Sequence, residues 1–258
     1  MRFGPVDFRR WYGCVAVWLA VLLLPAGGWA EERFLIDPAP VLVPAARGAT
    51  EAYRLRHYVG VEIRIPDGYV DGGRGMVMHG DGRVTSSREI IVVDRARDAR
   101  LREWLAFARS EQVQALAPRE RAVRLADFVI RLDGTEADGE ALVDDDRALA
   151  RRFASRGLLI GDVPVIASGS VCRHRALIFK LLGDEAGLPT ALVRGRYRHS
   201  DGRLGAHAWN ELHLDDGRLV VDLMASSSRR RYLAADSDRA EEKYLDLDGR
   251  TMYRAVSP

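Results

Sequence analysis

The chain has 258 residues, and its composition, 47% hydrophobic and 29% charged, is typical of a globular protein with enough apolar material for a core. The formal net charge is only +2, and the arginines among the first 30 residues account for it. The rest of the chain is neutral and lacks the basic surface that binds nucleic acid, so we expect no nucleic-acid partner.

The first 30 residues have the three parts of a secretory signal. Arg9 and Arg10 form a positive segment, residues 15–24 form an apolar segment, and small residues lead to Ala30. A membrane anchor is the alternative, but a span needs about 20 apolar residues, and the uninterrupted run covers only residues 14–24. We therefore predict cleavage after Ala30, export to a periplasmic or extracellular location, and no integral membrane span after cleavage.

The two cysteines are Cys14 and Cys172. Removal of the signal removes Cys14, so the mature chain would keep one thiol and form no internal disulfide. A single thiol in an exported protein indicates either an intermolecular bridge or a reactive site. It also excludes a zinc site built on a pair of cysteines.

Residues 31–95 are predicted to form a β-rich region whose role the sequence does not indicate. Hydrophobic alternation over residues 61–65 is typical of a half-buried strand, and short apolar runs at 76–78 and 90–93 predict two more. Asp81-Gly82 is compatible with a hairpin between these two runs.

Three helices are predicted between Asp98 and Gly157. Apolar residues recur at helical spacing after Asp98 and again after Pro118, where the second helix ends at residues 133–134. A third helix begins at the aspartates 144–146 and ends at Gly157. The aspartates suggest a metal site, but acidic residues also favour a helix N-terminus and no second ligand set has a recognisable spacing, so we favour the helix.

A well-bounded helix is predicted after Ser170. Ser170 is a suitable N-cap, residues 176–182 are apolar enough for burial on nearly all sides, and Gly187 with Pro189 ends the helix. Cys172 then lies in the first turn, where the helix dipole and free amides favour an anion, so its thiol is expected to ionise more easily than a free one. The alternative is that Cys172 is a small buried hydrophobe, as most lone cysteines are.

Antiparallel strands are predicted to follow this helix, over residues 190–195, 206–214 and 218–224. The last two are joined by a hairpin turn, placed at Asp216-Gly217 if the turn is an ideal two-residue one. Helices followed by antiparallel strands indicate an α+β fold, in which the cysteine helix packs on the sheet and residues 96–228 form the core.

Residues 229–258 form a strongly charged C-terminal segment. The arginines 229–231 could bind phosphate, but we expect a solvated or loosely docked tail, as charge runs usually are.

A cysteine nucleophile requires a base within hydrogen-bonding reach and a partner that orients the base. His207 is the candidate base, since the hairpin returns to an apolar run interrupted by Asp222, a carboxylate that is costly to bury without a partner. His174 lies two positions after Cys172 and so points away from it on a helix. An ideal turn places Asp222 opposite Glu211, with His207 four residues further along, so Glu211 is retained as a second-choice orienting residue.

Four segments occur in an order and spacing that match a known family: Cys172-Arg173-His174-Arg175-Ala176, Gly187-Leu188-Pro189, Val193-Arg194-Gly195 and Val221-Asp222-Leu223-Met224. Together with the His207-Ala208-Trp209 strand they resemble the transglutaminase-like cysteine-peptidase superfamily. The closest resemblance is to the peptidase-like domain of plant enhanced-disease-resistance-type kinases and armadillo-repeat proteins. It covers about residues 145–225 and not the N-terminal half.

The resemblance implies a papain/transglutaminase-like core and a role for each matching residue. Cys172 would be the thiolate nucleophile, His207 the general base and acid, and Asp222 the residue that holds the imidazole tautomer. Trp209 would shield these three residues, although it is equally suited to packing on the sheet. Arg173, His174 and Arg175 would contact an acidic substrate or pair with structural carboxylates such as those of the C-terminal tail.

The leading hypothesis is therefore an exported cysteine hydrolase or acyltransferase of transglutaminase-like type, acting on amide or isopeptide bonds of a peptide or protein substrate. No cofactor and no metal are expected. The alternative is a catalytically inactive peptidase-like binding module. A metal site formed by His207, His213 and Asp222 is disfavoured, because the two histidines lie too far apart along an extended strand.

Overall fold

The computed structural model describes residues 58–73, 75–79, 83–132, 149–154, 156–166, 170–225 and 231–254. All of them belong to one compact unit, Pro38–Pro258. The predicted signal segment and its cleavage site lie outside the described residues. In the ranges given above, no helix combines the length and the apolar character needed to cross a membrane.

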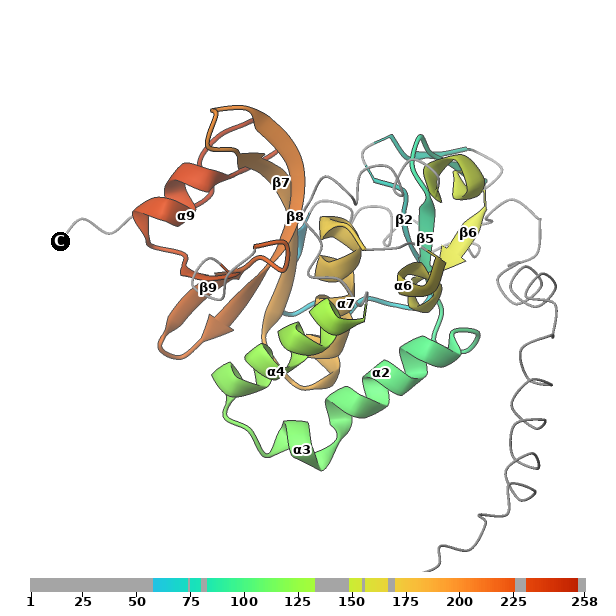
Figure 1. The fold of residues 1–258 in the computed structure, drawn as a ribbon, viewed down its shortest axis with the longest axis horizontal. Helices are drawn as coiled ribbons and strands as arrows, with labels where there is room; N and C mark the ends of the chain where they lie inside the picture. The colour runs from blue at the N-terminus through green and yellow to red at the C-terminus, as the bar shows by residue number, and fades with distance from the viewer. Residues whose placement is uncertain are drawn as a thin grey trace, which may run out of the picture. The chain divides into compact units, whose positions relative to one another are not determined.

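A six-stranded antiparallel sheet dominates the C-terminal half (Figure 1). Its strands follow the order β1-β7-β8-β9-β10, and β11 also pairs with β7. The strands are β1 (Tyr58–Val59), β7 (Thr190–Arg198), β8 (Leu204–Leu214), β9 (Gly217–Val221), β10 (Tyr232–Ala234) and β11 (Tyr244–Leu245). Side chains alternate across β8: Ala208 and Leu212 face the main core, whereas Trp209 faces a second cluster with Tyr244 and Tyr253.

Helix α7 (Cys172–Glu185) packs on the main-core face of this sheet, against β7 and β8. Its apolar residues are buried on all sides, as predicted for a central helix. The helix ends at Glu185, with Ala186 as its C-cap, because Gly187 takes a positive φ of 71° that favours glycine and the amide of Leu188 donates to the carbonyl of Gly183.

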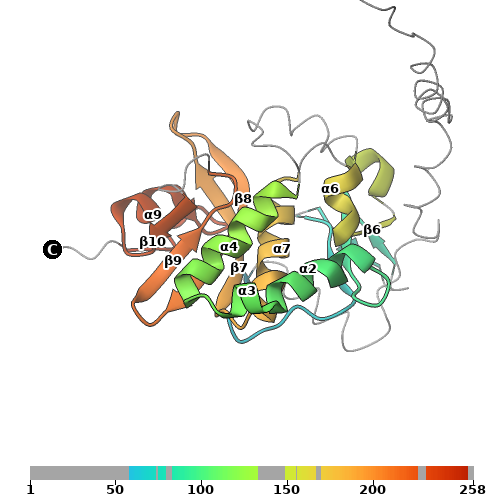
Figure 2. The ribbon, with the colours of Figure 1, turned by 60° about the horizontal axis from the view of Figure 1, so that its bottom comes forward.

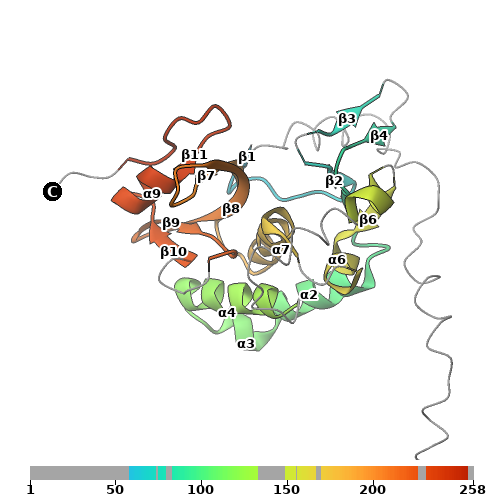
Figure 3. The same cartoon turned by 45° about the horizontal axis from the view of Figure 1, so that its top comes forward.

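Helices α2 (Ala99–Arg109) and α4 (Pro118–Arg131), joined through α3 (Glu111–Gln114), pack on α7 (Figure 2). Figure 3 shows α7 enclosed between these helices and the sheet. Helices α2 and α4 each bury their predicted apolar stripe, except that Ile130 is only partly buried. The buried residues are Leu101, Trp104, Leu105, Ala108, Ala122, Leu125, Ala126 and Val129. Helical backbone at residues 149–153 agrees with the third predicted helix, whose beginning lies outside the described residues. Its predicted end at Gly157 is wrong, because the helix stops at Phe153 and Gly157 is the first residue of a strand.

The N-terminal β region is arranged differently from the prediction. Strand β5 (Ile90–Val93) is present, but it pairs with β2 (Tyr69–Asp71) and, in parallel, with β6 (Gly157–Leu159). The neighbouring hairpin joins β3 (Val77–Met78) to β4 (Val84–Thr85), not to β5. The prediction of a strand at residues 61–65 is wrong. This segment has an irregular backbone, and it buries Ile65 in the main core. A short 3₁₀ helix, η2 (Ile160–Asp162), and α6 (Val163–Ile166) follow β6.

The prediction of a loosely docked C-terminal tail is wrong for residues 231–254. β10 pairs with β9, and after α9 (Asp238–Lys243) β11 pairs with β7. Tyr244 and Tyr253 are buried with Trp209 in the second cluster. A few large apolar side chains among many charges are therefore enough to fasten this segment to the sheet.

Candidate active site

Cys172 is the first residue of α7. The N-cap is Val171 rather than the predicted Ser170, and the Val171 amide donates to Nδ1 of His174 at 3.3 Å. The cap is thus supplied by the third residue of the helix instead of by a hydroxyl. Cys172 is partly exposed as a residue and carries a free thiol, which is located where helix amides favour negative charge.

Asp222 and His207 are hydrogen-bonded, with His207 Nε2 2.8 Å from Asp222 Oδ2. The side chains are 13% and 6% exposed, so the contact is shielded from water. Because Nε2 faces the carboxylate, Nδ1 is the ring nitrogen left for the thiol. The His207 ring and the backbone of Ala208 lie close enough to Cys172 to lower the pKa of its thiol.

The charges of this site favour a thiolate beside an imidazolium. Burial opposes ionisation of Cys172, but the hydrogen bond and charge of His207 outweigh it and lower the pKa of the thiol. Burial likewise disfavours a charged His207, yet Asp222 and Cys172 raise the pKa of the imidazole well above its usual 6.5. The two charged forms stabilise each other, and Asp222 contributes more than Cys172 to the raised pKa of His207.

Asp222 is held at both carboxylate oxygens. The Met224 amide donates to Oδ1 at 3.0 Å, and the Tyr244 hydroxyl donates to Oδ2 at 2.9 Å. Burial raises the pKa of Asp222. His207 and these two donors lower it by more than burial raises it, so the net shift is downward. The carboxylate therefore stays ionised although it is almost fully buried.

Glu211 does not contact His207. Its carboxylate accepts hydrogen bonds from Tyr253 at 2.8 Å and from Tyr58 at 3.4 Å, and His213 Nε2 lies 2.9 Å from it. The structure thus places the second-choice orienting residue in a separate buried contact that anchors the C-terminal segment. His213 lies there as well, apart from His207, and no group of metal-binding side chains gathers among the described residues.

Trp209 is fully buried beside the site. Its indole lies 6.0 Å from the His207 ring, nearly parallel to it, and donates to the Tyr253 hydroxyl at 2.8 Å. The rings of Tyr197 and Tyr244 lie 5.3 and 6.4 Å from the His207 ring. Trp209 thus both packs the sheet and forms part of an aromatic wall around the imidazole.

Arg173 and His174 turn toward the N-terminal strands rather than toward solvent. Arg173 donates to the carbonyls of Asp71 and Glu89 at 3.1 and 2.9 Å and pairs with the Glu89 carboxylate. His174 Nε2 lies 2.8 Å from Glu89, and Arg194 pairs with Asp71 at 2.7 Å. Of the two roles considered for Arg173 and His174, the structure supports pairing with structural carboxylates, but these belong to the N-terminal β region and not to the C-terminal tail.

Sequence reasoning missed Asp71 and Glu89. The available signal was a carboxylate at the edge of an apolar run, since Glu89 immediately precedes Ile90. Both carboxyls are buried, and the neighbouring arginines and His174 nevertheless lower their pKa. They tie the first turn of α7 to the N-terminal β region.

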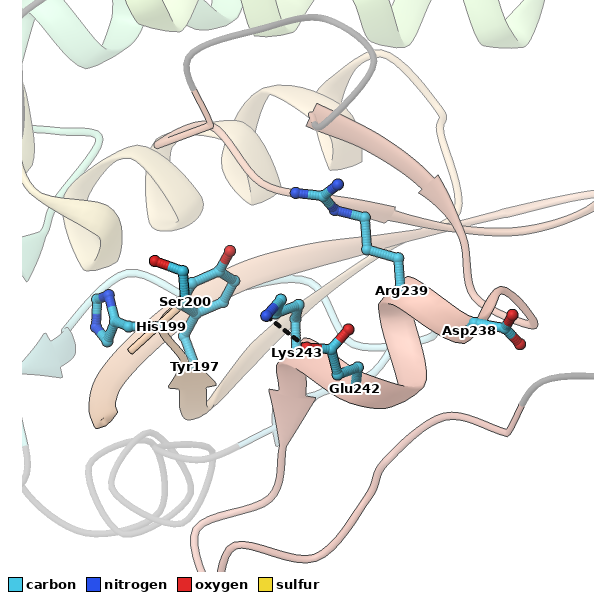
Figure 4. Close-up of a pocket in the computed structure, with 7 residues that line it drawn as sticks. All are labelled: Tyr197, His199, Ser200, Asp238, Arg239, Glu242 and Lys243. Carbon is cyan, nitrogen blue, oxygen red and sulfur yellow. Dashed lines mark hydrogen bonds and ion pairs between the residues drawn. The ribbon is translucent and has the colours of Figure 1, made fainter. Parts of the chain in front are cut away.

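A polar groove of about 540 Å³ adjoins the site through Tyr197 (Figure 4). One wall comes from the end of β7 and the other from α9; the lining residues are Tyr197, His199, Ser200, Asp238, Arg239, Glu242 and Lys243. Tyr197, which lines the groove, also packs on the His207 ring. Tyr197 is therefore the residue that the groove shares with the surroundings of the imidazole.

A cysteine at the start of a central helix, followed in sequence by a strand histidine and an aspartate on one antiparallel sheet, defines a papain/transglutaminase-like α+β fold. Residues 76–227, more than half of the chain, match the family described as EDR1/CTR1/ARMC3, peptidase-like, and the chain belongs to this family. The resemblance predicted from four short segments is confirmed, and the match extends into the N-terminal half, where none was predicted.

Among solved structures the chain is similar to the periplasmic domain of TgpA from Pseudomonas aeruginosa. The identity is 17% and the TM-score 0.30, and the similarity covers 61% of this chain and 62% of that one. No curated protein matches the chain.

Proposed function

We propose that this protein is an exported cysteine hydrolase that cleaves amide or isopeptide bonds in peptide or protein substrates. One arrangement carries the proposal: the His207 ring, which is hydrogen-bonded to the buried carboxylate of Asp222, lowers the pKa of the Cys172 thiol at the start of α7. A nucleophile, a base and an orienting group linked in this order are the requirements of covalent acyl transfer. Export is supported by the signal-like composition of the first 30 residues.

The proposed reaction begins with transfer of the thiol proton to Nδ1 of His207. The thiolate attacks the carbonyl carbon, and the free amides at the start of α7 stabilise the oxyanion that forms. The imidazolium returns its proton to the leaving amine, the carbon–nitrogen bond breaks, and a thioester remains on Cys172. His207 then deprotonates a water molecule, which attacks the thioester carbonyl. The carbon–sulfur bond breaks, the acid leaves, and the proton on His207 is again shared with the regenerated Cys172 sulfur. An amine in place of water would complete acyl transfer instead.

The groove beside Tyr197 supports an extended polypeptide as substrate. It is open and polar, and its lining carries both signs of charge, with Arg239 and Lys243 beside Asp238 and Glu242. Such a surface suits the mixed side chains and amide groups of a peptide better than it suits an apolar ligand. We infer that residues flanking the scissile bond lie along it.

The test is alkylation of the purified protein with iodoacetamide across pH. Mass spectrometry of the peptide that contains Cys172 keeps Cys14 out of the measurement. We expect an apparent pKa below that of a free thiol, about 8.5, and a return toward it in His207→Ala. Identical pH profiles in the two proteins would overturn the proposal.

A second measurement separates catalysis from binding. A fluorogenic peptide library should be hydrolysed by the wild-type protein and not by Cys172→Ala. An ionised thiol without turnover of any peptide, combined with equal peptide binding by both proteins, would instead identify a binding module.

A further inference from the structure

The C-terminal segment, residues 231–254, places the Tyr244 hydroxyl against Asp222. Tyr244 is 2% exposed, and its hydroxyl donates to Asp222 Oδ2 at 2.9 Å. The same oxygen lies 2.8 Å from His207 Nε2. One carboxylate oxygen therefore serves two donors, one from the proposed base and one from a segment that sequence patterns predicted to be a loose tail.

Tyr244 is placed by backbone pairing rather than by chance contact. In β11, Tyr244 pairs with Tyr197 and Leu245 with Arg196. The strand approaches β7 so closely that a side chain at Gly195 would collide with the Leu245 carbonyl oxygen, so only glycine permits this docking. The Tyr244 ring then packs 5.0 Å from the ring of Trp209, which fixes its direction toward Asp222.

We propose that Tyr244 is a positioning residue of the Cys172–His207–Asp222 site, acting on His207 through the carboxylate of Asp222. The inference rests on the proposed function and extends it: the C-terminal segment belongs to the catalytic unit. Tyr244 touches neither substrate nor the reacting atoms; it governs how strongly and in which direction Asp222 holds the imidazole.

Two physical effects follow from the shared oxygen. The carboxylate is fixed at Oδ1 by the Met224 amide and at Oδ2 by Tyr244, so rotation about its Cβ–Cγ bond is opposed at both ends. The hydroxyl also draws electron density from Oδ2, which moderates the attraction between Asp222 and the imidazolium. Without it, His207 would hold its proton more tightly and protonate the leaving amine more slowly.

The other groups that face His207 limit how its titration can be explained. The titratable groups among them are Cys172 from α7, Asp222 after β9, Tyr197 from β7 and Tyr244 from β11. The thiol and the carboxylate are present in every variant compared below except Asp222→Asn. A change in the pKa of His207 can then be assigned to the hydroxyl removed.

The chain contains a matched control in Tyr253. Its hydroxyl is as deeply buried, in the same cluster, and it bridges Trp209 and Glu211 at 2.8 Å on each side. Tyr253→Phe removes one buried hydroxyl from this segment without removing a contact to Asp222. Tyr244→Phe and Tyr253→Phe should therefore lower the melting temperature of the full-length protein to a similar extent.

The experiment compares the two variants by the NMR titration of His207 and by the pH profile of peptide hydrolysis. We expect Tyr244→Phe to raise the pKa of His207 and to lower kcat about tenfold, the order expected for losing a hydrogen bond to a charged group. We expect Tyr253→Phe to leave both unchanged. An active enzyme in which the two variants titrate alike would overturn the role of Tyr244.

Two further comparisons keep this outcome separate from failure of the proposed function. The NMR titration needs no turnover, so a shift in an inactive protein would support the role of Tyr244 in orienting Asp222 while the hydrolase proposal falls. In an Asp222→Asn background, Tyr244→Phe should cause no further shift, because the charge through which it acts is gone. A shift that persists there would show that Tyr244 acts on His207 by another route.

Discussion

Asp222 follows the last residue of β9 and lies opposite Trp209 across the β8–β9 hairpin. Trp209 is two residues after His207 in β8. Strand pairing begins at Leu214 and Gly217, and it continues to Asn210 opposite Val221. At this offset a carboxylate and an imidazole are diagonal neighbours, close enough for the 2.8 Å hydrogen bond observed. The register of one hairpin therefore decides which acid meets His207.

The first prediction distinguishes the two acids. Asp222→Asn should lower kcat by roughly 10²–10⁴-fold, because an amide cannot stabilise the imidazolium that forms during attack. Glu211→Gln should leave kcat nearly unchanged and lower the melting temperature, since Glu211 bonds Tyr253 and Tyr58 instead. Steady-state hydrolysis and thermal unfolding of both variants provide the measurement. Equal losses of kcat would contradict the assignment of Asp222.

The second prediction concerns pH and stability. The pKa of His207 is raised in the folded protein above its ordinary 6.5, so its ion pair contributes stability that is fully present below pH 6.5 and is lost as pH rises through the raised pKa. Urea unfolding of wild type and His207→Ala should therefore show the largest difference in free energy below pH 6.5, narrowing at higher pH. A difference that grows with pH in this range would indicate a neutral imidazole in the folded state.

The third prediction assigns a structural role to the N-terminal β region. Glu89 is buried against Arg173 and His174 at the first turn of α7. Glu89→Gln removes one partner of a buried ion pair, and such changes typically cost about 3–5 kcal/mol. Urea unfolding should show this loss, whereas Asp201→Asn, which breaks an exposed ion pair with Arg203, should leave stability almost unchanged.

Alkylation of Cys172 adds a second readout for Glu89→Gln. Because Arg173 and His174 flank the first helical residue, loosening their anchor should also shift the pH dependence of alkylation. If Glu89→Gln were as stable as Asp201→Asn, the ion pairs of Glu89 with Arg173 and His174 would not be what holds α7 in place.

Local sequence patterns were sufficient to predict the helices that bury a regular apolar stripe. The helix after Asp98 and the central helix at Cys172 follow from apolar spacing and from Gly187, because these signals act within one or two turns. The hairpin was located correctly, but its turn lies at residues 215–216. Gly217 uses its positive φ, 133°, as the first strand residue instead of inside the turn.

Partners distant in sequence could not be predicted in this way. Periodicity shows that a side chain is buried, not what it meets, and Glu89 meets His174 across 85 residues. Tyr244 meets Asp222 across 22 residues, within a segment whose charges outnumber its aromatic residues. The candidate nucleophile and base were found because their residue types are chemically distinctive. The groups that position them are ordinary buried polar residues.

The last prediction concerns the groove beside Tyr197. If it binds residues that flank the scissile bond, the double variant Arg239→Ala/Lys243→Ala should change KM about two- to fivefold for charged peptides and leave kcat unchanged. The effect is small because Arg239 is exposed and Lys243 already pairs with Glu242. Raising the salt concentration should reduce the difference between wild type and variant.

Arg109→Ala is the matched control for the groove, because it removes a surface cation on α2 that pairs with Glu185 away from the groove. Its KM should equal that of the wild type. A kcat lowered in the groove variant would instead place Arg239 or Lys243 in contact with the reacting part of the substrate. An unchanged KM for every charged peptide would show that the substrate approaches Cys172 from another side. Of the residues that line the groove, Tyr197 is the one whose ring packs near the His207 ring.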